Sequence, residues 1–381
     1  MFDKKLLKNL DMTFLLGIIA ILIMSVFVLA SASAHVMPND VYYFAKKHLM
    51  FIVTGLGMMI FIGSLNYVQL ARMQRLLYII NILILLIVLI PGIGKTSNGA
   101  QSWIGIGSFT LQPSEFAKVI LIITFAQFLS NKQGKLNTFK DFIPCFLYVS
   151  VPLLLILLQP DLGTSLVFIA IMFGMMLAAG ANPKILGGLF FGGILFIVIT
   201  LWMHFHFGLP LPLKDYQIMR LVVFLNPYND GKGGLGAGYN IIQSLIAVGS
   251  GGIWGKGLGH GSQGQLNFLP YHHTDFIFSV IGEELGLIGG LLLLALYFLI
   301  LYRALRIAMQ AKDMYGLLLV MGVVSMFTFH ILENIGMAIG VMPITGIPLP
   351  LFSYGGSNMW ANLAALGLIL SVNLRRQVIA F

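Results

Sequence analysis

Long apolar stretches, each of a length that can cross a lipid bilayer, recur along the whole chain. A transmembrane helix needs about 20 mostly apolar residues. Stretches of this kind occupy residues 13–33, 47–65, 76–94, 114–130, 142–159, 163–181, 185–204, 274–302, 315–340 and 357–374. The pattern predicts an all-α polytopic membrane protein, a ten-helix bundle that forms a single integral membrane domain over residues 1–381.

Charged residues are too rare for a water-soluble protein. Only 9% of the 381 residues are charged and 58% are apolar, whereas about 25% of residues are charged in soluble domains. This composition excludes a water-soluble enzyme and an intrinsically disordered chain. The single cysteine, Cys145, also excludes a disulfide framework and a cysteine-based zinc or iron–sulfur centre.

The basic residues are concentrated on one side of the predicted membrane. With the N-terminus inside, the segments on that side carry 14 of the 22 Lys and Arg residues and four acids, a net of +10, and the rest of the chain has a net of −1. Cytoplasmic segments of membrane proteins carry such an excess of Lys and Arg, so both termini are predicted to be cytoplasmic. Because topology accounts for the net charge of +9, no nucleic-acid partner is expected.

The longest segment between spans, residues 205–273, separates the seventh span from the eighth and is predicted to be extracytoplasmic. It is too long to be a simple connector. Residues 241–248 are apolar enough for an interfacial helix or a re-entrant segment. Residues 231–236 and 259–264 match G-x-G-x-x-G, but that pattern indicates dinucleotide binding only within a βαβ unit. We interpret both as flexible backbone.

Few ionisable residues lie inside the predicted spans, and residues of this kind are functional candidates because their burial in lipid is costly. Glu115 and Lys118 stand three residues apart on one helix face and can pair. They either take part in function or only neutralise each other. Glu333 lies in the middle of the ninth span, where a structural hydrogen bond and a catalytic role are both open.

The densest polar cluster precedes and begins the eighth span. Thr274 is a good N-cap residue and places Asp275 in the first helical turn, at the outer membrane boundary. Helical spacing puts Glu283 about 80° around the axis from Asp275, so both can face one cavity, whereas Glu284 is predicted to face another helix. The alternative for Asp275 is an ordinary acid at a helix start.

Irregular backbone gathers on the same outer side. Residues 159–164 and 342–357 are rich in proline and glycine, and non-helical backbone at membrane depth is tolerated only against protein or a wet cavity. His272 and His273 precede the eighth span, but adjacent histidines do not converge on one ion by themselves, so no metal site is predicted. The sequence therefore predicts a functional cavity that opens to the extracytoplasmic face, without identifying the substrate.

Several motifs in this order resemble the shape, elongation, division and sporulation family of bacterial cell-wall polymerases. The resemblance extends nearly from end to end, and two short segments, 213–217 and 334–337, look more like the RodA branch than the FtsW branch. The strongest motifs are Gln112-Pro-Ser-Glu115, Gln159-Pro-Asp-Leu-Gly-Thr164, the run from Gly238 to Pro270, His273-Thr-Asp-Phe-Ile-Phe278, Gly282-Glu-Glu-Leu-Gly286 and Pro348-Leu-Pro-Leu-Phe-Ser-Tyr-Gly-Gly-Ser357.

This resemblance implies polymerisation of lipid II, the undecaprenyl-diphosphate-linked disaccharide pentapeptide, into glycan strands at the outer face of the cytoplasmic membrane. It implies that Asp275 is the essential acid and that Trp103, Glu115 and Lys118 are functional positions. It also implies a class B penicillin-binding protein and other elongation-complex membrane proteins as partners. Many family members carry an arginine just before this tryptophan, where Gln101 and Ser102 stand here.

The implied reaction converts an α-linked donor into a β-1,4 product, for which one inverting displacement suffices. We expect Asp275 to act as the base for the acceptor 4-hydroxyl. Positive charge must stabilise the departing diphosphate, with no resident cofactor required and a divalent cation, Mg²⁺ or Mn²⁺, as an additional carrier of that charge. The residues expected to contact substrate are Trp103, Glu115, Lys118, Arg220, Lys256, His273 and Glu283.

Two other functions suit the same pattern. A lipid II flippase would place acids and bases near the membrane midplane and would show an inverted repeat, but no repeat is visible and the polar groups cluster at the outer boundary. A non-catalytic scaffold for a transpeptidase is the second alternative. Polymerisation in detergent distinguishes the polymerase from the flippase, because transport needs a sealed bilayer.

Overall fold

The computed structural model describes residues 9–34, 40–97, 100–106, 109–211 and 214–376. Within these ranges, helices lie at all ten predicted positions. They are α2 (Met12–Ala32), α3 (Tyr43–Ser64), α5 (Gln74–Leu89), α6 (Pro113–Ser130), α7 (Phe139–Leu158), α8 (Leu162–Ala178), α9 (Pro183–Phe207), α14 (Gly286–Met309), α15 (Met314–Ala338) and α16 (Gly356–Leu374). Eight are long and apolar enough to cross a membrane, and α5 and α8 are shorter apolar helices. The chain is a multi-pass, mostly helical membrane protein, as predicted.

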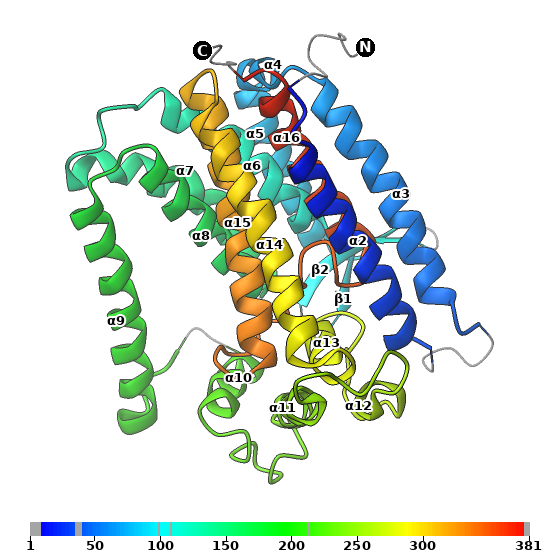
Figure 1. The fold of residues 1–381 in the computed structure, drawn as a ribbon. Coiled ribbons are helices and arrows are strands. Elements are labelled where there is room, and N and C mark those ends of the chain that lie inside the picture. Colours follow the sequence, from blue (N-terminus) through cyan, green and yellow to red (C-terminus); the bar gives the residue numbers. More distant parts are fainter. Residues whose placement is uncertain (1–8, 35–39, 98–99, 107–108, 212–213, 377–381) are drawn as a thin grey trace.

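The centre of the bundle is formed by α6, α15 and α16, most of whose residues are buried. Helix α15 packs against α6, α8 and α14, and α16 runs along α3 (Figure 1). The approach of α16 to α3 depends on glycine, since a Cβ atom on Gly367 would lie 2.8 Å from the carbonyl oxygen of Met59. Small residues serve this purpose in membrane bundles because they let backbones come close together.

The two ends of the bundle are formed by different parts of the chain. The first and last helices meet at one end, where the side-chain amide of Asn9 donates to the carbonyl oxygen of Leu374 at 3.2 Å. The segments between α9 and α14 gather at the opposite end (Figure 1), which we call the loop end. Helix α9 stands at the edge of the bundle and packs mainly on α8. Because Leu186 is the one buried residue among its 25, α9 is suited to a lipid surround.

A small antiparallel sheet lies between α5 and α6. Its strands, in the order β1-β2-β3, are Gly94–Ser97, Ala100–Ile106 and Phe109–Leu111. Lys95 pairs with Trp103, and Ile104 pairs with Leu111. The sequence did not predict this sheet, because its strands are too short to show the alternation of a half-buried strand. The sheet holds Trp103 on its middle strand.

The predicted extracytoplasmic segment 205–273 is largely folded. It contains α10 (Asp215–Leu225), α11 (Tyr239–Gly251) and the short α12 (Ser262–Gln265). The apolar residues 241–248 form part of α11, which packs on α13 (Ile277–Glu284). In this contact, Ser244 Oγ lies 2.6 Å from Ser279 Oγ and donates to Ala338 O at 2.7 Å.

The first G-x-G-x-x-G match, residues 231–236, lies in an ordered turn around one carboxylate. Asp230 accepts hydrogen bonds from the backbone N–H groups of Lys232, Gly234, Gly236 and Gly238 at 2.6–3.2 Å. These bonds lower the pKa of Asp230 to about 2. The interpretation of this repeat as flexible backbone is therefore wrong, because its N–H groups are bound to a side chain of the same loop.

The predicted eighth span, 274–302, is broken into two helices. Helix α13 ends at Glu284, and α14 begins at Gly286, whose φ of 65° turns the chain. Backbone from the preceding loop bonds at the break: Lys256 N donates to Glu283 O at 3.0 Å, and Leu287 N donates to Gly252 O at 2.9 Å. These bonds satisfy polar groups that a helix break exposes.

The start of α13 also differs from the prediction. The helix begins at Ile277 with Phe276 at the N-cap position, and the Thr274 hydroxyl donates to Tyr271 O at 3.2 Å instead of capping the helix. Asp275 therefore lies in the turn before the helix and not in its first turn. Local hydrogen bonds of the Thr274 side chain compete with helix capping, and here they prevail.

Helix α11 approaches α13 so closely that a methyl group cannot be accommodated between them. A Cβ atom on Gly251 would lie 1.9 Å from Gly282 O, whereas Gly249 of the same helix has nothing within 4 Å of its Cβ position. We expect Gly251→Ala to destabilise the protein by about 1–3 kcal/mol, the usual cost of overpacking. Gly249→Ala should leave stability unchanged or raise it, because alanine favours helix. Thermal unfolding in detergent measures both, and equal midpoints would contradict the close contact.

Candidate active site

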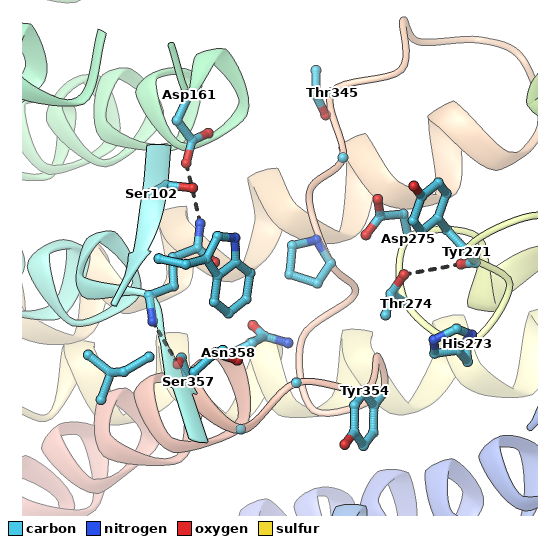
Figure 2. A pocket seen from close by; sticks show the side chains of 18 of the residues that line it. Ser102, Asp161, Tyr271, His273, Thr274, Asp275, Thr345, Tyr354, Ser357 and Asn358 are labelled. Carbon is cyan, nitrogen blue, oxygen red and sulfur yellow. Dashed lines mark hydrogen bonds between the residues drawn. The ribbon is translucent and has the colours of Figure 1, made fainter. Parts of the chain in front are cut away.

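A cavity of about 630 Å³ lies toward the loop end, within the range of about 300–1,000 Å³ for small-molecule sites. Six parts of the chain form its wall, so it depends on the tertiary fold (Figure 2). They are the start of α3, strands β2 and β3, the turn before α8, helix α10, the turn before α13, and the segment from Thr345 into α16.

Charged side chains face each other across this cavity. Among the described residues that line it, the acids are Asp161 and Asp275, and the permanent cations are Lys47 and Arg220. Asp161 and Asp275 lie on opposite sides (Figure 2). A substrate group that approaches Asp275 therefore meets a single carboxylate, and the cations Lys47 and Arg220 lie elsewhere in the cavity lining.

Asp275 is held in a tight turn. The N–H groups of Thr274 and Phe276 both donate to Tyr271 O, at 3.0 and 3.2 Å. Burial of the carboxyl raises its pKa to about 7, although the charge of Arg220 and a hydrogen bond from Thr274 act in the opposite direction. This shift brings the ionisation of the carboxyl toward neutral pH, which suits a group that accepts and returns protons.

The wall beside Asp275 is bare backbone. Gly346 has a φ of 78°, and a Cβ atom there would lie 3.5 Å from Asp275 Oδ2. Any other residue at this position would be strained and would cover the carboxylate. Arg220, on α10, reaches the same wall and donates from Nη1 to Thr345 O at 3.3 Å.

His273 lies among aromatic rings on the cavity wall. Its ring centroid is 5.1 Å from that of Phe44 and 6.2 Å from that of Tyr354. Burial lowers the pKa of His273 to about 4, with a smaller contribution from His272. His273 is therefore neutral at physiological pH and supplies no positive charge, but its ring can form part of a sugar-binding surface.

Trp103, one of the residues expected to contact substrate, lines the cavity from strand β2. Gln112, just after strand β3, joins this wall to the starts of α16 and α8. Its backbone N–H donates to Ser357 Oγ at 3.0 Å, and its Nε2 donates to Asp161 Oδ2 at 3.4 Å. Just before Trp103, Gln101 and Ser102 stand where many members of the resembled family carry an arginine, and the side chain of Gln101 lies outside the described residues.

Glu115 and Lys118 form the predicted pair but lie outside the cavity lining. Lys118 Nζ is 2.9 Å from Glu115 Oε1, and both side chains are at most 4% exposed. Lys118 Nζ also lies 3.0 Å from His330 Nε2, and His330 Nδ1 lies 3.1 Å from Pro348 O. The pair therefore reaches the cavity through His330 and Pro348 and not by direct contact.

Lys256 and Glu283 bind each other away from the cavity. Their charged atoms are 2.6 Å apart, with the Glu283 side chain fully buried. Glu283 also accepts from Ser262 Oγ at 3.0 Å. The expectation that Glu283 shares the cavity of Asp275 is wrong, because helical spacing does not extend through the turn that holds Asp275. The prediction that Glu284 faces another helix is confirmed, since it accepts from Ser31 Oγ of α2 at 2.7 Å.

Other cavity residues were not predicted. Lys47 lies near the start of the second span, where a lysine is typical of a membrane boundary. Asp161 belongs to a motif that was noted for its irregular backbone and for the family resemblance, but Asp161 itself was not predicted as a site residue. It caps α8 by accepting from Thr164 N at 3.0 Å. Tyr216 lies in the segment 213–217, which was noted only for its likeness to one branch of the family, and the fold places Tyr216 and Lys47 in the same cavity lining as Asp275.

Potential metal-ligating side chains are sparse in the described lining of the cavity. Among the residues that the structure describes, no three His, Cys, Asp or Glu side chains are grouped so that they could hold an ion. Asp161 and Asp275, the acids noted above, are separated by the width of the cavity (Figure 2).

The chain is similar to known proteins over nearly its whole length. It is 40% identical to stage V sporulation protein E of Bacillus subtilis (strain 168) over 88% of each chain. It is 37% identical to peptidoglycan glycosyltransferase MrdB of Escherichia coli (strain K12), over 98% of this chain and 95% of that one.

Solved structures share its fold. A chain from a peptidoglycan synthase complex, described in terms of coordinated polymerization and crosslinking, matches with a TM-score of 0.77 and 31% identity, over 95% of this chain and 97% of that one. The crystal structure of rod shape determining protein RodA from Thermus thermophilus matches with a TM-score of 0.68 and 29% identity, over 96% and 97%. The sequence model of the FtsW, RodA and SpoVE cell cycle proteins matches residues 10–378, and the chain therefore belongs to this family.

Proposed function

We propose that this protein is a peptidoglycan glycosyltransferase that polymerises lipid II into β-1,4 glycan strands at the outer face of the cytoplasmic membrane. The observation that carries the proposal is a carboxyl with a pKa of about 7 on the wall of a cavity large enough for a sugar headgroup. The similarity to a peptidoglycan glycosyltransferase of E. coli supports the substrate class. The loop end, which holds the cavity, is then extracytoplasmic, and both termini are cytoplasmic.

In the proposed reaction, the acceptor sugar's 4-hydroxyl attacks the anomeric carbon of the donor. Asp275 takes the hydroxyl proton as the new C–O bond forms, and the bond from the anomeric carbon to the diphosphate breaks with its electron pair on the leaving oxygen. The attack inverts the anomeric centre, from α to β. Proton removal by a positioned carboxylate contributes about 10²–10⁴-fold to such a rate.

Arg220 and Lys47 are the proposed contacts of the diphosphate, because both line the cavity. Cations that are fixed before the reaction stabilise charge that develops on the leaving group. Lys118 and Lys256 are less suitable, since each is already bound to a carboxylate. Trp103 and His273 would offer ring faces to the sugars.

The charge of Arg220 also affects the proton affinity of Asp275, which gives a pH-dependent prediction. Arg220 lowers the pKa of Asp275, so Arg220→Gln should raise it. Because the base acts when ionised, activity should rise with pH through about 7 in the native protein, and this rise should move to higher pH in the variant. The dependence of kcat/KM on pH measures it. Lys214→Gln, which removes an exposed cation just before α10, should not move the rise, and an equal shift in both variants would contradict the assignment.

The proposed function is tested with purified protein and lipid II in detergent. We expect glycan polymer to form, which electrophoresis of the products would detect. A flippase yields no polymer under these conditions, and a scaffold yields none without a second enzyme. Absence of polymer from folded protein, in the presence of Mg²⁺ or Mn²⁺ and of a class B penicillin-binding protein, would overturn the proposal.

A role in cell elongation, together with a class B penicillin-binding protein and other elongation-complex proteins, is the finer part of the proposal. Its support is the match to a rod shape determining protein and to a chain of a peptidoglycan synthase complex. The similarity to a sporulation protein favours a specialised wall instead. Restoration of rod shape in cells depleted of their own RodA would distinguish the two, with sporulation as the other outcome.

A further inference from the structure

One face of α15 carries three buried polar side chains that bind the cavity segment, which we define as residues 341–355. His330 lies 3.1 Å from Pro348 O, Glu333 accepts from the Thr345 hydroxyl at 2.6 Å, and Asn334 donates to Ile347 O at 2.8 Å. Buried polar groups in a membrane helix are costly unless they are bonded. This face therefore fixes the part of the wall that contains Gly346.

Asn334 is the member of this face that also reaches the turn of Asp275. Its Nδ2 atom donates to Asp275 O at 2.8 Å and to Ile347 O at 2.8 Å. Its side chain is fully buried on α15. One amide group thus joins the backbone of the proposed base to the wall that lies against the carboxylate of that base.

The same turn is held at two further carbonyl oxygens. Tyr354 N donates to His273 O at 3.1 Å, and Ser353 Oγ donates to Thr274 O at 2.6 Å. Three consecutive carbonyl oxygens before α13 therefore accept bonds from the cavity segment or from α15. The turn cannot shift relative to the cavity without losing several buried hydrogen bonds, each of which is expensive to leave unmade.

We propose that Asn334 is a positioning residue for the glycosyl transfer, which acts by holding the carboxylate of Asp275 against the cavity. This inference rests on the proposed function, because it takes Asp275 as the base. Asn334 does not line the cavity, so it has no direct contact with substrate there. Its loss should reduce the rate of the chemical step and leave lipid II binding almost unchanged.

The test is Asn334→Asp, which keeps the shape of the side chain but replaces the N–H donors by an oxygen that faces two carbonyl oxygens. We expect kcat for lipid II to fall about 10- to 100-fold, since a displacement of about 1 Å in a reacting group costs up to about 10²-fold. KM should stay within about twofold, because uniform binding is unaffected. Rates are taken at the alkaline plateau of each variant, so that a changed pKa of Asp275 does not contribute.

The matched control is Asn81→Asp. Asn81 is also fully buried, and its amide also donates to a backbone carbonyl, that of Ala117 on α6. Asn81→Asp therefore has a burial cost similar to that of Asn334→Asp but removes no bond to the turn of Asp275. Because it does not touch the reacting groups, kcat should remain within about threefold of the native value.

A second variant guards against misfolding. If Asn334→Asp does not fold, Ser353→Ala removes only the bond to Thr274 O and that from Leu349 N, and it should lower kcat with KM unchanged. A native kcat in every folded variant of this set, or an equal loss in Asn81→Asp, would overturn the positioning role. Asp275→Asn is assayed alongside: if it keeps full activity, the proposed base is wrong, whereas an inactive Asp275→Asn with a fully active Asn334→Asp refutes the positioning role alone.

Discussion

Replacing Asp275 by asparagine should reduce the polymerisation of lipid II by about 10²–10⁴-fold, the usual contribution of a positioned base. The substitution keeps the size of the side chain but removes the group that takes the proton of the acceptor hydroxyl. Folding should be retained, because burial disfavours the charged form of this carboxyl and the amide has no such cost. The rate of polymer formation in detergent, with the unfolding temperature, measures both effects.

The control for this variant is Asp215→Asn. Asp215 begins α10 in the same loop region and is exposed. The substitution therefore removes one acid from the loop end without altering the cavity. Its activity should equal that of the native protein. If Asp275→Asn retains native activity, or if both variants lose activity equally, the proposed base is refuted.

Replacing Lys118 by methionine should produce the largest loss of stability. The substitution leaves Glu115 as an unpaired acid in the centre of the bundle, where its side chain is 4% exposed. Breaking one partner of a buried pair costs about 3–5 kcal/mol. The double variant Glu115→Gln with Lys118→Met should recover most of this loss, because neither charge then remains. Equilibrium unfolding of the purified variants provides the comparison.

Two further measurements sharpen this prediction. Lys46→Met breaks an exposed ion pair with Asp40 and should leave stability unchanged, since exposed pairs contribute little. The KM for lipid II should be native in any folded variant at Lys118, because this lysine does not line the cavity. A double variant as unstable as Lys118→Met would show that charge pairing is not the cause, and a raised KM would restore Lys118 as a substrate contact.

Helix positions were largely predictable, because a bilayer imposes a minimum length on every apolar stretch. One exception is the eighth span, which was predicted as a single helix over residues 274–302 but is broken at Gly286. The break is stabilised by backbone from residues 252–257, a contact between parts of the chain that sequence periodicity does not relate. The sheet between α5 and α6 was missed because strands of three to seven residues show too little periodicity.

The candidate site was predictable only in part. Trp103, Arg220, His273 and Asp275 all line one cavity, whereas the lysines 118 and 256 are bound to buried acids. Residue type and motif marked all of these as candidates, but they do not reveal which charges are already paired. Pairing depends on atoms that come within about 4 Å of each other in the folded chain.

The amino-acid order alone predicted a chain that lies mostly in lipid and the approximate limits of its helices, and its resemblance to a known family indicated the acid on which the proposed chemistry depends. These features follow from local properties, namely apolar length, the distribution of basic residues and short motifs. The cavity, the wall of backbone at Gly346 and the bonds from Asn334 to two distant segments were decided by the tertiary structure. They arise because helices far apart in the chain pack together, and only this packing determines which polar groups face the cavity and which bind one another.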